Sequence, residues 1–273
     1  MFTVNKKQTG LIASLTVMEL IYHNTVRSIR KGHRHAMVGL LVNILQTVIF
    51  VGVFYFMFDV LGLKSNAIRG DFVLYIFSGI FLFMTNTKTM GAVLSAEGPT
   101  SAMMQHAPMN TAISIGSTAL GALYIQILSV SVVLGVYHMA IRPIVIDQPI
   151  AAMGMLLLAW LNGVAVGMVV LALKPWAPGF VAIANTLYSR VNMFASGKMF
   201  VANTLSYTMV SMFDWNPLFH ILDQARGFVF INYNPQKTSL EYPIYVTLAL
   251  LMLGLMGEFY TRKHASLSWT AGR

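Results

Sequence analysis

Long runs of apolar residues alternate with short polar stretches along most of this chain. A helix needs about 20 apolar residues to cross the hydrocarbon core of a bilayer, and five runs reach or approach that length. We expect spans at 36–58, 72–94, 111–141, 150–173 and 242–260. A sixth span, short or broken, is expected within 176–208, where Pro178 lies at the start and Arg190 and Lys198 interrupt the apolar run. The pattern predicts an all-α integral membrane fold with six transmembrane helices.

The first 35 residues have a different pattern. Between residues 9 and 34, apolar side chains recur along one stripe of a helix, and polar or basic side chains lie opposite. The stripe has Leu11, Leu15, Met18, Tyr22, Val26 and Ile29, and the other face has His23, Arg27, Lys31 and Arg34. Such an amphipathic helix lies in the membrane surface. We therefore divide the chain into an interface helix (1–35), a membrane domain (36–260) and a tail (261–273).

A short helix is predicted just before the last span, within residues 214–235, DWNPLFHILDQARGFVFINYNP. Asn216 is a good N-cap, and Pro217 suits the first helical position because its missing N–H would be unpaired there anyway. One face has Leu218, Ile221, Leu222, Ala225 and Val229, and the other has His220, Asp223, Gln224 and Gly227. The helix is too short and too polar to span a bilayer, which indicates a re-entrant or interfacial gate helix. Asp223 and Arg226 can pair across one turn as an exposed ion pair.

Composition and charge agree with a membrane protein. Apolar residues make up 56% of the chain and charged residues 10%, against roughly 45 to 50% apolar in soluble domains. The net charge of +9 could indicate nucleic acid, but basic residues gather at the ends of apolar runs, which is the ordinary topology signal. We expect no nucleic-acid partner.

The distribution of basic residues also predicts orientation. Six lysines and arginines precede the first span, whereas the first loop has two. The positive-inside rule then places the N-terminus in the cytoplasm, and six spans bring the C-terminus to the same side. Residues 95–110 are therefore expected in the cytoplasm and 211–240 outside.

Catalytic and metal-binding patterns are missing. The chain has no cysteine, no GxSxG or HExxH motif, and no glycine-rich loop that ends in Gly-Lys-Ser/Thr. Residues 196–199, SGKM, lack both the upstream glycine and the hydroxyl that binds magnesium. His33 and His35, two residues apart, would point to different sides of a helix. We expect no catalytic residue, cofactor or metal on this chain.

The acidic residues bear on the energy source. All nine lie in loops, near span ends or in the terminal helix, whereas ion-coupled transporters carry carboxylates inside their spans. A separate ATPase subunit, which would hold ATP and magnesium, is the better source. It could dock on 95–110, SAEGPTSAMMQHAPMN, where methionines give an adaptable apolar surface and Glu97, Gln105 and His106 give polar contacts. A simple loop with a short amphipathic turn is the alternative.

Three features inside the spans remain. Lys198 would cost about 2.5 to 3.5 kcal/mol at mid-bilayer, so we expect it to face a water-filled path or to snorkel to the outer surface. Gly163 and Gly167 form a GxxxG pair, typical of close helix packing. Aromatic residues in the first two spans could line a glycan path, although lipid-facing or interfacial roles are commoner. They are Phe50, Phe54, Tyr55, Phe56, Phe58, Tyr75, Phe77, Phe81 and Phe83.

One motif is distinctive. It reads Asn216-Pro217-Leu218-Phe219-His220, followed by Asp223, Arg226, Tyr233 and Tyr242. With weaker matches at 27–30, Pro108, Asn110 and Ser196-Gly197, the whole chain resembles the membrane subunits of ABC-2 type exporters. Within them it is similar to exporters of capsular polysaccharide and, more distantly, of lipopolysaccharide O-antigen. Two departures are Asp223, where glutamate is more usual, and the lack of a basic residue near 105–110.

The resemblance implies two copies of the subunit in the bacterial inner membrane, each with an ATPase subunit bound from the cytoplasm. Lipid-linked polysaccharide would be the substrate. The resemblance is also compatible with periplasmic and outer-membrane export proteins as further partners. The resemblance also implies coupling through 95–110, with Glu97, Gln105, His106 and Pro108. External gate helices would lie in 212–235, with Asn216, His220, Asp223, Arg226, Tyr233 and the nearby Lys198.

Two alternatives stay open. The first is an ABC-2 subunit for O-antigen, lipids or drug-like molecules. The second belongs to another class, a membrane-embedded glycan or lipid transferase. Such an enzyme needs polar catalytic groups clustered at one membrane face, and His220, Asp223 and Arg226 are the group that qualifies.

Overall fold

The computed structural model describes residues 10–31, 36–60, 62, 68, 70–97 and 110–264. All regular structure in these residues is helical, which confirms the all-α class. The helices are α1 (Gly10–Lys31), α2 (Ala36–Val60), α3 (Phe72–Leu94), α4 (Thr111–Ala140), α5 (Pro149–Leu173), α6 (Pro178–Ala195), the 3-10 turn η2 (Ala202–Thr204), α7 (Tyr207–Phe213), α8 (Pro217–Val229) and α9 (Glu241–His264).

Five of the described helices are long and apolar enough to cross a membrane: α2, α3, α4, α5 and α9. They coincide with the five clear apolar runs of the sequence. The predicted broken span contains α6, which has 18 residues and packs beside α5. It is not among the five, because Arg190 and several polar residues dilute its apolar character.

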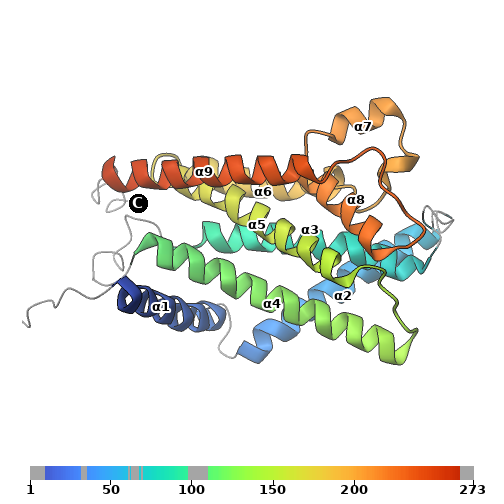
Figure 1. Cartoon of the computed structure of the whole chain (residues 1–273), viewed down its shortest axis with the longest axis horizontal. Helices are drawn as coiled ribbons and strands as arrows, with labels where there is room; N and C mark the ends of the chain where they lie inside the picture. The colour runs from blue at the N-terminus through green and yellow to red at the C-terminus, as the bar shows by residue number, and fades with distance from the viewer. Residues whose placement is uncertain are drawn as a thin grey trace, which may run out of the picture.

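The described helices run back and forth between two ends of the molecule (Figure 1). One end has α1 and the C-terminal end of α9, and the other has α7 and α8. Contacts at the α1 end agree, because the Lys174 ammonium donates to the Leu94 carbonyl, 3.0 Å away. At the α8 end, the Gln148 N–H donates to the Phe228 carbonyl, 2.8 Å away. The two ends of α5 therefore lie at opposite ends of the molecule, one beside the end of α3 and the other beside α8.

The α3 and α5 helices form the centre of the bundle, and small residues let them approach closely. A Cβ added at Gly163 would lie 2.5 Å from the Asn86 carbonyl oxygen, and one at Gly167 would lie 2.9 Å from the Val93 Cβ. The Asn86 amide donates to the Ala159 carbonyl and to the Asn162 side chain, each 3.0 Å away. The GxxxG pair therefore serves close packing, as the sequence predicted.

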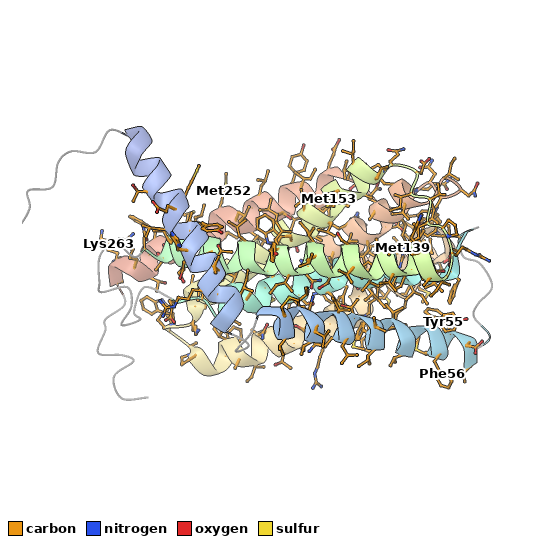
Figure 2. All side chains as sticks on the ribbon, turned by 90° about the horizontal axis from the view of Figure 1, so that it is seen from below. Tyr55, Phe56, Met139, Met153, Met252 and Lys263 are labelled. Atoms are coloured by element: carbon orange, nitrogen blue, oxygen red, sulfur yellow. The ribbon has the colours of Figure 1, made fainter. Side chains whose placement is uncertain are left out.

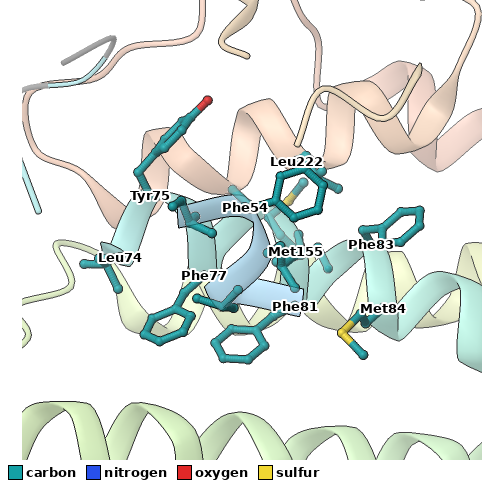
Figure 3. Close-up of a cluster of buried hydrophobic side chains, with 14 of the residues drawn as sticks. Phe54, Leu74, Tyr75, Phe77, Phe81, Phe83, Met84, Met155 and Leu222 are labelled. Atoms are coloured by element: carbon teal, nitrogen blue, oxygen red, sulfur yellow. The ribbon is translucent and has the colours of Figure 1, made fainter. Parts of the chain in front are cut away.

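Most aromatic residues of the first two spans pack in the core. Phe54, Tyr75, Phe77, Phe81 and Phe83 are buried within a cluster that also includes Met155 and Leu222 (Figure 3). Tyr55 and Phe56 are exposed and lie on the outer side of α2 (Figure 2). Most of these aromatic residues pack in the interior, which differs from both the glycan path and the lipid-facing or interfacial roles that the sequence suggested.

The α1 helix crosses the bundle at a steep angle at the end where Lys263 lies (Figure 2). It packs on α4, and the Asn24 amide donates to the Ser117 hydroxyl at 2.6 Å. Met18 and Tyr22, from the predicted apolar stripe, are exposed, whereas Ile29 is partly buried against α4. This crosswise placement is the geometry expected of an interface helix.

Candidate functional site

Helix α8 begins where the sequence predicts. The Asn216 side-chain oxygen accepts from the Leu218 N–H at 3.0 Å, and Pro217 occupies the first turn. The Asn216 amide nitrogen also donates to the Asn192 side chain at 2.9 Å and to the Ala195 carbonyl at 3.0 Å. The cap therefore also joins the start of α8 to the end of α6.

Both faces of α8 are buried. The apolar residues Leu218, Ile221, Leu222 and Ala225, which the spacing placed on one face, are at most 1% exposed. The polar residues His220, Asp223 and Arg226 are also at most 4% exposed. This differs from the expectation of an exposed polar face, because segments on either side of α8 in the sequence fold over it.

Arg226 reaches the segment that follows α6. Its guanidinium donates to the carbonyls of Gly197 at 2.8 Å, Lys198 at 2.9 Å and Phe200 at 2.6 Å. The guanidinium carbon also lies 4.4 Å from the centre of the Tyr75 ring of α3. Arg226 thus fixes an otherwise irregular backbone stretch against α8, since each of these buried carbonyls needs a donor.

Asp223 has a different set of partners from Arg226. One carboxylate oxygen accepts from the Tyr233 hydroxyl at 2.5 Å and from the Ala202 N–H at 3.2 Å, and the other accepts from the Thr238 hydroxyl at 2.8 Å. Burial raises the pKa of the Tyr233 phenol, and the nearby Asp223 carboxylate raises it further, so the phenol keeps the proton that it donates. No ion pair joins Asp223 to Arg226 in the described residues, which corrects the predicted exposed pair.

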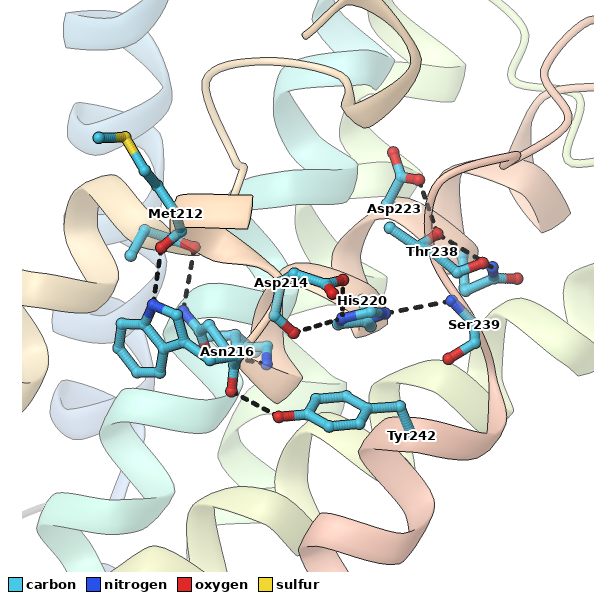
Figure 4. Close-up of polar contacts among 12 residues, drawn as sticks. Met212, Asp214, Asn216, His220, Asp223, Thr238, Ser239 and Tyr242 are labelled. Atoms are coloured by element: carbon cyan, nitrogen blue, oxygen red, sulfur yellow. Dashed lines mark hydrogen bonds and ion pairs between the residues drawn. The ribbon is translucent and has the colours of Figure 1, made fainter. Parts of the chain in front are cut away.

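His220 links α8 to the segments before and after it (Figure 4). Its Nδ1 accepts from the Ser239 N–H at 3.1 Å. Because a backbone N–H can only donate, the ring proton is on Nε2, which donates to the Asp214 carbonyl at 2.8 Å and lies 3.1 Å from the Asp214 carboxylate. The ring also lies 4.8 Å from that of Tyr242, whose hydroxyl donates to the Trp215 carbonyl at 2.8 Å.

Lys198 does not lie where the sequence suggested. Its ammonium is buried over the rings of Phe50, Phe54 and Phe83, at 4.5, 4.9 and 3.7 Å from their centres. No hydrogen-bond partner for this nitrogen lies among the described residues. The expectation of a water-filled path or of snorkelling is therefore wrong for this conformation. Gly79 of α3 permits the arrangement, because a Cβ there would lie 3.0 Å from the Lys198 carbonyl oxygen.

These contacts join three segments into one unit, which we call the α8 clasp: α8 itself, residues 196–206 and residues 233–239. Arg226 and Asp223 hold 196–206, while Asp223 and His220 hold 233–239. Six gate residues had been singled out in the sequence. Five of them lie in the clasp, and the sixth, Asn216, caps α8 directly before it.

A family model described as ABC-2 type transporter matches residues 19–230, from α1 through the end of α8. The chain belongs to the ABC-2 type transporter family. No curated protein matches it. This ABC-2 permease is therefore the membrane subunit of an ABC exporter and not itself an enzyme; permeases of this family generally dimerise and work with an ATPase partner.

The predicted coupling residues of this permease are only partly visible. Gln105, His106 and Pro108 lie outside the described residues. Glu97 lies three residues after the last residue of α3, and its N–H donates to the Ser114 hydroxyl at 3.0 Å. Coupling through these four residues stays a prediction.

Some clasp partners had no signal in the sequence. Thr238 contacts Asp223, and Asn192 contacts the Asn216 cap, only through the fold. Tyr75, noted in the sequence only as one of the aromatic residues, lies against Arg226. A local clue existed only at Gly197, whose φ of +73° favours glycine. Within the described residues, no group of three His, Asp or Glu side chains could hold a metal ion.

Proposed function

We propose that this permease exports a lipid-linked anionic polysaccharide of the capsular type across the bacterial inner membrane, together with a second copy of itself. Two ATPase subunits, which hold ATP and magnesium, would supply the energy from the cytoplasm. Both termini would be cytoplasmic, with α6 as the sixth crossing. The motif from Asn216 to Tyr233 supports this proposal, because the residues that resemble capsular exporters also build the α8 clasp at the end opposite α1.

Helix α3 is the element that could transmit the ATPase signal. Its C-terminal end leads directly into 95–110, the proposed coupling region. Its N-terminal half contacts the clasp, since Tyr75 lies against Arg226 and Gly79 against Lys198. A displacement of 95–110 would therefore reach the clasp through one rigid helix. We propose that the clasp moves as a unit to open an external gate in 212–235.

Lys198 has a role of its own in this proposal. In the closed arrangement its ammonium is covered by rings of α2 and α3. Separation of these helices would free a cation at the outer end of the path. An advancing anionic polymer could then bind there, because opposite charges attract strongly where water is scarce.

The transferase alternative loses its support. His220, Asp223 and Arg226 are each engaged with backbone or hydroxyl groups and are almost fully buried. A catalytic acid or base must reach the group whose proton it takes or gives. The rivals that remain are export of O-antigen, lipid or drug-like molecules by the same fold.

The substrate class can be tested with the permease reconstituted in vesicles together with its ATPase. We expect lipid-linked polysaccharide to stimulate ATP hydrolysis and small amphiphiles to leave it at the basal rate. Stimulation by amphiphiles alone would favour the drug or lipid alternative. Purification from native membranes without any ATPase subunit would remove the proposed energy source.

Lys198→Met is expected to keep the permease folded and to raise its Tm, while the rate of polymer export falls. An unpaired buried ammonium is costly, and the contacts with three rings offset only part of that cost. Each kcal/mol gained corresponds to about 2 to 4 °C in Tm for a protein of this size. Lys263→Met, at an exposed lysine outside the clasp, is the charge-matched control. A lower Tm in Lys198→Met would show that the contacts with the three rings fully offset the cost of burying the ammonium.

A further inference from the structure

A cavity of about 540 Å³ lies at the α1 end, enclosed by α1, α2, α3 and α4. Its volume is in the range of small-molecule sites, roughly 300 to 1,000 Å³. Its wall also contains five long polar or charged side chains: Arg27, Asn43, Gln46, Lys88 and Gln126. Neither the α8 clasp nor the proposed coupling mechanism uses these residues, apart from Glu97 at the rim.

Lys88 is the central cation of this cavity. Its ammonium donates to the side-chain oxygens of Asn43 and Gln46, the latter at 3.0 Å. The Asn43 amide nitrogen donates to Gln126 at 2.8 Å and to Ser129 at 2.6 Å, which leaves the Asn43 oxygen for Lys88. The network therefore orients neutral acceptors around the charge. Among the described residues, no carboxylate forms an ion pair with Lys88.

The charge of the wall favours an anion. Lys88 and Arg27 contribute two positive charges, and Glu97 contributes the one negative charge among the lining residues. A cation that is half removed from water and held by neutral oxygens binds an anionic oxygen favourably, because charge-assisted hydrogen bonds are the stronger ones. Phosphate oxygens have this chemistry.

The surroundings suit an anion that carries an apolar tail. Gln46 is exposed at the edge of the cavity. Farther along α2, Ile49 and Val53 follow it at helical spacing, and they are 55% and 59% exposed. An apolar strip thus leads from the polar cavity toward the middle of the bilayer. A lipid can therefore place its head group in the cavity while its acyl chain lies along this strip.

We propose that this cavity binds the phosphate head group of an anionic phospholipid from the leaflet at the α1 end, with an acyl chain along α2. The ligand would join α1, α2 and α3 close to the start of 95–110. The site is independent of the polymer that the permease exports, so it can stand or fall separately from the proposed function.

Retention of phosphatidylglycerol and phosphatidylcholine can be measured by native mass spectrometry of the purified permease after incubation with each lipid. We expect Lys88→Gln to lower phosphatidylglycerol retention by about tenfold or more, the equivalent of roughly 1.4 kcal/mol, with phosphatidylcholine unchanged. Lys263→Gln removes the same charge at the same end but outside the cavity, and should bind like the wild type. Equal phosphatidylglycerol retention in Lys88→Gln and wild type would overturn the proposal.

A second variant covers the possibility that Lys88→Gln fails to fold. Ala122→Phe fills the cavity from α4 and leaves the Lys88 hydrogen bonds in place. It should also lose phosphatidylglycerol, and unchanged retention in this folded variant would contradict the site. Competition with millimolar inorganic phosphate separates the sources. Complete displacement of the lipid from the wild type would identify a soluble phosphate site and overturn the lipid assignment.

Discussion

Replacing Arg226 with alanine is expected to abolish polysaccharide at the cell surface while the permease still inserts into the membrane. The guanidinium makes hydrogen bonds to three buried carbonyls of residues 197–200. A hydrogen bond to a charged group contributes about 1.5 to 3 kcal/mol, and the carbonyls left behind would be buried without donors. The α8 clasp would come apart, whereas the spanning helices keep their own packing. Surface glycan staining, together with the amount of permease in the membrane, measures both effects.

Two comparisons make the Arg226 result specific. Arg190→Ala removes the same side chain from an exposed position of α6 and should leave export intact. Arg226→Lys keeps the charge but cannot reach three carbonyls with one compact ammonium, so we expect it to fail as well. Normal export in Arg226→Lys would mean that charge alone matters at this position, and normal export in Arg226→Ala would remove the clasp from the mechanism.

Gly163→Val is expected to cause the largest loss of folded permease. Its Cβ would lie 2.5 Å from a backbone carbonyl of α3, and two packed helices cannot yield as a flexible side chain can. Overpacking of a core commonly costs about 1 to 3 kcal/mol, and here it also separates α3 from α5 and strains the Asn86 hydrogen bonds. Size-exclusion chromatography of a fluorescent fusion should show aggregate in place of the monodisperse peak.

Gly154 is the matched control for Gly163. It lies on the same helix, and a Cβ there would meet nothing within 4 Å. Gly154→Ala should therefore fold normally and gain slightly in helix propensity. A monodisperse peak from Gly163→Val, as strong as that of Gly154→Ala, would show that the α3 and α5 contact is not as tight as the structure describes it.

Local patterns accounted for the helices of this permease. Five spans, the crosswise α1 and the start of α8 follow from apolar run length, amphipathic spacing and an Asn-Pro cap. The predicted sixth span was harder to judge, since α6 carries polar residues and is not among the five helices that are long and apolar enough to cross a membrane. Such signals are local because helix formation depends on residues within a few turns.

The partners of the polar residues could not be inferred in the same way. Spacing alone suggested that Asp223 pairs with Arg226 one turn away. In the structure, Asp223 instead accepts hydrogen bonds from Tyr233 and Thr238, and Arg226 donates to the backbone of 197–200. Once both side chains are buried, each must satisfy its hydrogen bonds with whatever the fold brings near. The residue one helical turn away is then only one of several available hydrogen-bond partners.

The sequence by itself determined that this chain is a helical membrane protein, where its helices begin, and that a polar motif precedes the last span. Only the tertiary structure decided that the motif is buried as a clasp, that Lys198 lies among aromatic rings, and that Lys88 faces a polar cavity. The reason is physical. Apolar periodicity is set within one helix, whereas the burial of a charge depends on segments far away along the chain.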